Sequence, residues 1–183
     1  RKDHRPTELC VKTIDEIKVL NPKSAYRDST FWIFLVAMSL FGIVFLQFFS
    51  TIPLYYKDVH GLSELEIGLL MGMNGFIIFA LEMPLVKWFE NSKRSQSGLM
   101  LIGAILTGLS FLILTSGSWI GILIISMLLV TFGEMIAFPF SNAFAMDRSK
   151  KGNKGEYMAL YSIAFSVAHL FSHNGGMHLI ESI

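Results

Sequence analysis

Two carboxyl groups lie inside apolar stretches of the sequence, where an ionisable side chain could carry protons. Glu82 and Glu134 each stand within a run of apolar residues long enough to cross a bilayer. A charged side chain at the centre of a membrane helix costs about 2.5–3.5 kcal/mol, so each one indicates a partner, a cavity or a function. Because burial disfavours the charged form, a carboxyl group whose exposure alternates would take up and release protons. We therefore select Glu134 and Glu82 as candidate proton-coupling residues.

The two carboxyl groups are expected at a similar depth, past the midplane and near the inner mouth. Glu134 follows Trp119 by 15 residues, about 22 Å along a helix. Glu82 follows Glu66 by 16 residues on a helix that runs the same way. The alternative is that a carboxylate pairs with a basic residue and only holds a helix end. That alternative is favoured for Glu82, five residues before Lys87, whereas Glu134 has no basic residue within ten positions.

Two histidines add titratable groups to the last apolar segment. His169 and His173 share one helical face with Ser162 and Ser166. Imidazole titrates near neutral pH, which suits a proton relay or a substrate contact. The spacing also permits binding of one metal ion, but a metal site needs further ligands. The remaining alternative is that both imidazoles have hydrogen-bond partners and only pack between helices. We expect neither a metal nor a cofactor.

Weaker polar stripes occur on three other segments. They contain Gln47 on the first, Asn74 with Glu82 on the second, and Asn142 with Glu134 on the fourth. The third segment, in contrast, offers only Thr107, Ser110 and glycines. This distribution predicts a water-accessible cavity lined by all helices except a peripheral third one. The alternative is a solid bundle in which these groups form interhelical hydrogen bonds.

The elements that must position these residues are membrane helices. The chain has 183 residues, 52% of them hydrophobic and 16% charged, with a mean hydropathy of +0.53. A soluble domain could not hide so much apolar surface. The fold class that we predict is an all-α membrane protein with five transmembrane helices. Their expected positions are near 31–55, 66–88, 97–115, 119–145 and 156–178. Small residues at Gly68, Gly72 and Gly75 predict a close helix contact on the second of these.

Basic residues indicate the orientation of the bundle. Fourteen of the 15 lysines and arginines fall in alternate segments, namely residues 1–30 and the second and fourth loops. By the positive-inside rule these segments are cytoplasmic. The net charge of +1 does not suggest nucleic acid as a partner, and Cys10, the single cysteine, excludes an internal disulfide framework.

The chain divides into a linker and a bundle. Residues 1–30 are expected to be a cytoplasmic linker, within which Val11, Ile14 and Ile17 recur at helical spacing. A short amphipathic helix on the membrane surface and a flexible tether explain this segment equally well. Residues 31–183 form the predicted transmembrane helical bundle. Because the chain begins without methionine and an odd number of spans ends directly at Ile183, both ends are expected to be cut.

Four stretches of the sequence resemble the C-terminal half of a major facilitator superfamily transporter. Residues 45–56 (FLQFFSTIPLYY) look like its seventh helix, and residues 61–68 (GLSELEIG) like the entry to its eighth. Residues 132–139 (FGEMIAFP) are similar to the tenth helix of drug:proton antiporter-like members, and residues 155–161 (GEYMALY) to the start of the eleventh. The resemblance thus covers helices seven to eleven of twelve. The signature loop between helices eight and nine survives only as Lys93-Arg94.

The resemblance implies a secondary active transporter of a small organic solute, coupled to protons and located in the bacterial inner (plasma) membrane. Such proteins work by alternating access, with the substrate held between two six-helix halves. The implied partners are therefore a small-molecule substrate, protons, the lipid bilayer and a missing N-terminal six-helix half. Glu134 would be the protonatable carboxyl, and Lys93 with Arg94 the remnant of a gating loop. The implied cavity contacts are Gln47, Asn74, Asn142, His169 and His173.

Other functions fit parts of the same pattern. A polytopic membrane metalloenzyme would use His169 and His173 with further ligands, although the sequence contains no motif for nucleophilic catalysis or phosphate binding. A structural subunit would tolerate Glu134→Gln. Within the same superfamily, a proton-coupled peptide or sugar symporter is the alternative. We expect a transporter rather than an enzyme.

Overall fold

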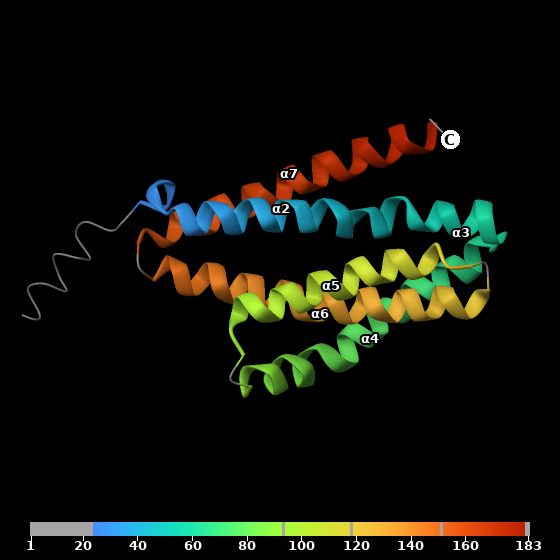
Figure 1. The fold of residues 1–183 in the computed structure, drawn as a ribbon, viewed down its shortest axis with the longest axis horizontal. Coiled ribbons are helices and arrows are strands. Elements are labelled where there is room, and N and C mark those ends of the chain that lie inside the picture. Colours follow the sequence, from blue (N-terminus) through green and yellow to red (C-terminus); the bar gives the residue numbers. More distant parts are fainter. Residues whose placement is uncertain (1–23, 93, 118, 151, 182–183) are drawn as a thin grey trace, which may run out of the picture.

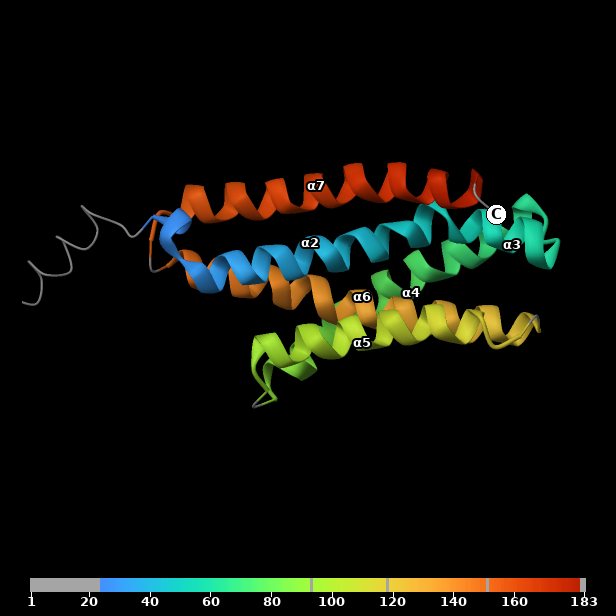
Figure 2. The same ribbon diagram turned by 45° about the horizontal axis from the view of Figure 1, so that its top comes forward.

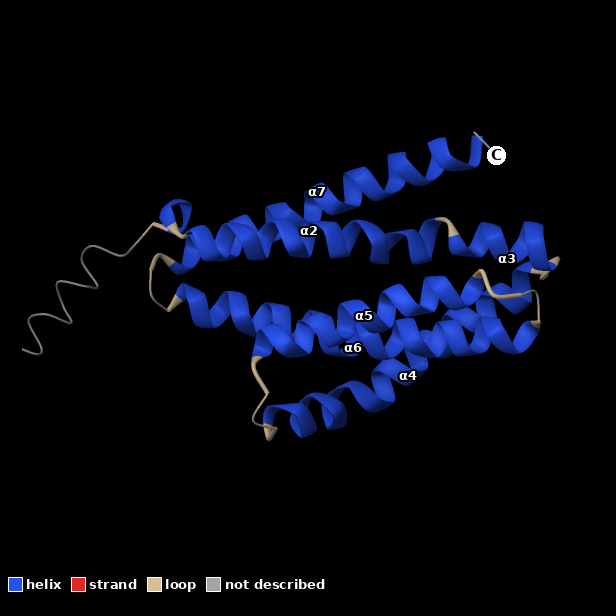
Figure 3. Cartoon of the chain, in the orientation of Figure 1, coloured by secondary structure: helices blue, strands red, loops and turns tan. Residues whose placement is uncertain are grey.

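The computed structural model describes residues 24–92, 94–117, 119–150 and 152–181. This part of the chain consists of helices joined by short turns and contains no extended strand (Figure 3). Most of the predicted linker lies outside the described residues, including the stretch expected to form an amphipathic helix. The elements are η1 (Ala25–Arg27), α2 (Ser29–Ser50), α3 (Ile52–His60), α4 (Glu64–Glu90), α5 (Gln96–Leu114), α6 (Ile120–Ser149) and α7 (Lys154–Glu181).

Four of the described helices are long and apolar enough to cross a membrane, namely α2, α4, α5 and α6. Their outer surfaces suit that environment, since Phe79 and Met83 of α4 are 87% and 78% exposed. The helix α7, with 28 residues, occupies the place of the predicted fifth span. The predicted all-α class is thereby confirmed, whereas the fifth crossing stays a prediction.

The first predicted helix is divided in two. The sequence analysis expects one helix over 31–55, but α2 ends at Ser50 and α3 begins at Ile52. Pro53 lies in the first turn of α3. Proline has no N–H, and its ring clashes with the carbonyl of the residue four positions earlier, so it favours a helix start over a helix interior. The helix α3 then ends at Gly61, whose positive φ of 64° suits glycine.

The helices form two closely packed pairs and one crossing helix (Figures 1 and 2). The helix α5 lies along α6, α2 lies along α7, and α4 crosses α6. The helix α6 contacts α2, α4, α5 and α7, which makes it the central element. The helix α5 packs chiefly on α6, and the peripheral place of the third span stays a prediction.

Two glycines bring α5 and α6 into close contact. A Cβ atom on Gly103 would lie 2.7 Å from the carbonyl oxygen of Gly133, and one on Gly133 would lie 2.5 Å from Oγ1 of Thr107. The backbones therefore approach where only glycine fits. The close helix contact predicted for Gly68 and Gly72 is not made by the described residues, because a Cβ atom at either position would meet no neighbour within 4 Å. Within the described residues, α4 does not use these glycines for packing.

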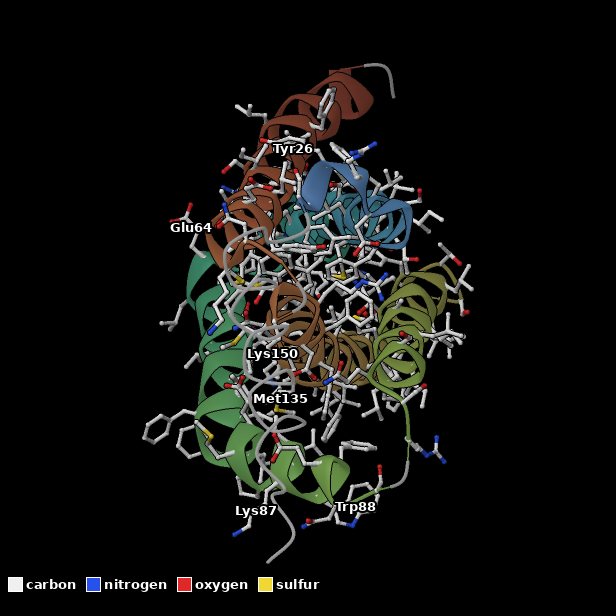
Figure 4. All side chains as sticks on the ribbon, turned by 90° about the vertical axis from the view of Figure 1, so that its left-hand side faces the viewer. Tyr26, Glu64, Lys87, Trp88, Met135 and Lys150 are labelled. Carbon is white, nitrogen blue, oxygen red and sulfur yellow. The ribbon has the colours of Figure 1, made fainter. Side chains whose placement is uncertain are left out.

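The loops that the positive-inside rule assigns to the cytoplasm lie together at one end of the bundle. Here α2 begins, α4 ends, α5 begins, α6 ends and α7 begins. Figure 4 views the molecule from this end, which carries the labelled side chains of Tyr26, Lys87 and Lys150. The arrangement agrees with the predicted alternation of loops, and the assignment of this end to the cytoplasm remains a prediction from charge.

Candidate functional site

The helix α6 places Glu134 near the centre of its length, between buried neighbours. Gly133 and Met135 are both buried, and Met135 lies inside the bundle in the end-on view (Figure 4). The Glu134 side chain as a whole is half-buried. Its Oε2 atom is fully buried and has no hydrogen-bond partner among the described residues. A carboxyl oxygen in this state would gain a hydrogen bond from a proton, a ligand or a neighbouring group that moves.

The helix α4 supplies the polar neighbours of this carboxyl group. Asn74 is 3% exposed, and its Oδ1 accepts a hydrogen bond from the hydroxyl of Thr131 on α6, which is fully buried. Asn74 lies beside the Glu134 carboxyl group without a hydrogen bond to its Oε2 atom, and Glu82 acts on the same group as a like charge. The crossing of α4 and α6 thus places Asn74 next to Glu134, with Glu82 close enough for its charge to act there.

The alternative of ion pairing receives no support from the described residues. The ion pairs there are Lys57–Glu64, Asp28–Arg148 and Lys150–Asp147, and neither Glu82 nor Glu134 takes part in one. Lys93, one of the partners considered for these carboxylates, lies outside the described residues. The arrangement that the structure displays is a buried carboxyl oxygen without a partner beside the amide of Asn74, with the charge of Glu82 acting on it.

The remaining predicted site residues are not joined to Glu134. Gln47 on α2 is half-buried, whereas Asn142 on α6, His169 on α7 and Arg94 are exposed. No hydrogen bond from one of these four side chains reaches the carboxyl group in the described part of the chain. The side chain of His173 and all of Lys93 lie outside the described residues. Gln47, Asn142, His169 and His173 stay predictions as cavity contacts, and Lys93 with Arg94 as a gating remnant.

The described residues do not assemble the histidine-based metal site considered for α7. Among the described residues, no group of three or more His, Cys, Asp or Glu side chains could hold a metal ion. The exposed His169 therefore has no ligand set around it there. What this part of the structure offers at the α4–α6 crossing is a carboxyl group, which can bind and release a proton, beside an amide and a hydroxyl.

Sequence reasoning missed a second polar cluster, the Asp28 clasp, which consists of Asp28, Arg148 and Tyr157. Nε of Arg148 donates to Oδ2 of Asp28 at 2.7 Å, and Nη2 donates to Oδ1 at 2.8 Å. The Tyr157 hydroxyl donates to Oδ2 at 3.0 Å, and Oδ1 also accepts the N–H of Phe31 at 3.3 Å. The Arg148 guanidinium holds the pKa of Asp28 well below its usual range.

The clasp joins the starts of α2 and α7 to the end of α6. Glu156 extends it, because its Oε2 accepts hydrogen bonds from Oγ of Ser24 at 2.9 Å and from the N–H of Ala25 at 3.0 Å. The signal in the sequence was an aspartate directly before the first span and an arginine in a basic loop. In the sequence, Arg148 stands out only as one of the basic residues that indicate the orientation.

Comparison with known proteins places these helices among membrane transporters. The family model described as Major Facilitator Superfamily matches residues 2–173. A protein of Planococcus maritimus named "Na(+), Li(+), K(+)/H(+) antiporter" is 24% identical over 160 residues, which cover 80% of this chain and 37% of that protein. No solved structure was found to match.

Two proteins of Bacillus subtilis (strain 168) are also similar, and both are named as uncharacterized MFS-type transporters. YqjV is 25% identical over 142 residues, covering 76% of this chain and 34% of that protein. YttB is 29% identical over 127 residues, covering 67% and 30%. The chain thus spans about a third of the length of the curated relatives that it matches.

Proposed function

Because the chain belongs to the Major Facilitator Superfamily, we propose that it is part of a secondary active transporter that moves a small organic solute across the membrane and couples this movement to protons. The family resemblance seen in the sequence is confirmed. The chain is an integral membrane protein, and its bacterial relatives support a place in the bacterial inner membrane. Family membership favours a transporter over the membrane metalloenzyme.

The observation that carries the proton coupling is the buried, unpartnered Oε2 atom of Glu134. A carboxyl group in a water-poor site is stable when protonated and costly when charged. If the protein alternates between two states that open this site to opposite sides, the proton enters from one side and leaves to the other. Differential affinity for the proton in the two states then shifts their populations, which is how a gradient drives a conformational cycle.

Glu82 takes a supporting part in this proposal. Its negative charge acts on Glu134, so Glu82 modulates proton release from that group without being the group that is carried. The proposed substrate contacts are Gln47, Asn74, Asn142, His169 and His173. Of these, Asn74 is buried at the α4–α6 crossing, and the others would face the other half of the full-length protein.

A second candidate substrate is an alkali-metal cation. The relative from Planococcus maritimus is named for the exchange of Na⁺, Li⁺ and K⁺ against H⁺. The cluster at the α4–α6 crossing contains a carboxyl group, an amide and a hydroxyl, from Glu134, Asn74 and Thr131. Oxygen atoms of these types are the ligands that hard cations take. A cation and a proton would then compete for binding to Glu134. Because only one of them can be bound at a time, this competition would exchange one ion for the other across the membrane.

Transport in everted membrane vesicles tests the proposal. Vesicles with the full-length protein would receive NaCl, LiCl, KCl, cationic dyes, peptides and sugars in turn, with a pH-sensitive dye inside. We expect at least one addition to move protons with the wild type and not with Glu134→Gln. Proton movement that is equal in both proteins would contradict the role of Glu134. Movement on addition of cations alone would favour the second candidate, and movement with dyes the first.

A further inference from the structure

Thr131 stands between two oxygen atoms that both accept hydrogen bonds. Its single hydroxyl proton can point to Oδ1 of Asn74 or to the main-chain carbonyl of Met127, whose oxygen lies 2.7 Å from Oγ1. One hydroxyl donates fully to only one acceptor, although it can accept from another donor at the same time. All of this occurs out of water, because Thr131 is 0% exposed and Asn74 is 3% exposed.

The side-chain amide of Asn74 can form a hydrogen bond with the Thr131 hydroxyl in either of these two orientations. An asparagine side chain has one accepting and one donating end, and a half turn about its last bond exchanges them without a change of shape. Asn74 contacts Thr131, and Glu134 follows Thr131 by three residues on α6, so its carboxyl group, whose Oε2 atom has no hydrogen-bond partner among the described residues, lies on the same side of the helix. The orientation of Asn74 therefore ties the hydroxyl of Thr131 to the protonation state of Glu134.

Two complete hydrogen-bond patterns follow from these groups. When Glu134 is ionised it can only accept, so the amide N–H of Asn74 donates to it, and Thr131 donates to Oδ1 of Asn74. When Glu134 is protonated, its O–H donates to Oδ1 of Asn74. The amide N–H of Asn74 then donates to Oγ1 of Thr131, and Thr131 donates to the carbonyl of Met127. In each pattern every donor named here has an acceptor, and the second amide N–H of Asn74 takes no part in the exchange.

We propose that Asn74 is a positioning residue whose amide reverses when Glu134 gains or loses its proton, and that it thereby transmits proton occupancy from α6 to α4. The inference rests on the proposed function, in which Glu134 carries the proton. Because Asn74 belongs to α4 while Glu134 and Thr131 belong to α6, the reversal changes the polar contact between two helices. A buried network with two satisfied states is suited to a two-state cycle.

The other titratable side chains on the helices packed against α6 do not take the place of Asn74 beside Glu134. The described parts of α2 and α5 contain no titratable side chain. The helix α4 contributes Glu82 near the site and Lys87 at its end, and α7 contributes Tyr161, whose hydroxyl pairs with Ser141, and the exposed His169. His173 also lies on α7, and its side chain is outside the described residues. Asn74 differs from these groups because it is not titratable and because it contacts Thr131, one helical turn from Glu134.

Infrared difference spectroscopy during a pH change tests the proposal on the full-length protein in liposomes. The carbonyl stretch of a protonated carboxyl group reports the hydrogen bond that the group makes. We expect a band that titrates in the wild type and is lost in Glu134→Gln. In Asn74→Leu the band should persist and move to higher wavenumber, because the acceptor of its O–H is gone. Asn91→Leu, the same change at an exposed amide at the end of α4, should leave the band in place.

A second measurement needs no substitution at Asn74. Wild-type protein with ¹³C in the asparagine side-chain carbonyl should show a labelled amide band that changes as Glu134 titrates. That change should be absent in Glu134→Gln. A Glu134 band that is unaffected by Asn74→Leu, with an invariant labelled amide band, would overturn the proposal and leave the proton site intact. The absence of a Glu134 band at every pH would instead overturn the proposed function.

Discussion

Asp28 and Arg148, which are 120 residues apart in the sequence, form a two-pronged ion pair at one end of the bundle. Both oxygens of the carboxylate accept from the guanidinium, at 2.7 and 2.8 Å, and the side chains are only 17% and 27% exposed. Two parallel charge-assisted hydrogen bonds of this kind are stronger and more specific than a single contact. The pair fixes the start of α2 to the end of α6, and Tyr157 adds α7.

Loss of this pair should destabilise the bundle. In Asp28→Asn the guanidinium keeps only neutral partners, and we expect a loss of about 1–3 kcal/mol in the free energy of unfolding. The thermal midpoint of the purified full-length protein in detergent would measure it. Asp147→Asn is the matched control, since the Asp147–Lys150 pair is 52% and 68% exposed and contributes little. Equal midpoints for Asp28→Asn and the control would contradict the structural role of the clasp.

The clasp should also depend on pH in one direction. The pKa of Asp28 is lowered in the folded protein, so its contribution is complete above the unfolded value of about 4 and is lost as pH falls through the folded value. The difference in stability between the wild type and Asp28→Asn should therefore be constant above about pH 5 and shrink in acid. Thermal midpoints across this range provide the check, and a difference that grows in acid would show the opposite sign.

Close packing of α5 on α6 should make Gly103 intolerant of a side chain. A methyl group there would lie 2.7 Å from a main-chain oxygen, so we expect Gly103→Ala to cost about 1–3 kcal/mol by overpacking. Gly108→Ala on the same helix is the control, because a Cβ there meets nothing within 4 Å. Thermal midpoints of the two variants would compare them directly. If Gly108→Ala proved as damaging as Gly103→Ala, the packing described for α5 and α6 would be wrong.

Orientation can be tested with single cysteines in a protein without other cysteines. We expect Lys150→Cys to react with a membrane-impermeant thiol reagent in everted vesicles, where the cytoplasmic face is outside. Lys57→Cys, at the opposite end of the bundle, should react in intact cells. Both positions are exposed, so access to the reagent depends on the side of the membrane. The reverse pattern of labelling would invert the orientation that the positive-inside rule predicts.

The candidate site was predictable because its signal is local. Glu134 and Glu82 are charges in apolar runs, and Asn74 shares a helical face with Glu82, so hydropathy and helical periodicity are enough to select them. The connection of Asn74 to Thr131 was not predictable, because it depends on how α4 crosses α6. The sequence pattern of a single helix does not show where that helix crosses another.

Other features of the fold depended on contacts between distant residues. The Asp28–Arg148 pair joins positions 120 residues apart, and Gly103 of α5 meets Gly133 of α6. The motif at Gly68 and Gly72 indicated a contact that the described helices do not make. The division after Ser50 was hidden because the apolar run continues through it, and Pro53 was its one local signal.

The central claim is that Glu134 carries the proton that drives transport. The most direct measurement compares two kinds of flux of one substrate in proteoliposomes that contain the full-length protein. In the wild type, both exchange of the substrate at equal pH and movement against its gradient under a proton gradient should occur. We predict that Glu134→Gln, a permanent mimic of the protonated form, retains exchange and loses the proton-driven movement. Proton-driven movement at the wild-type rate in Glu134→Gln would contradict the claim.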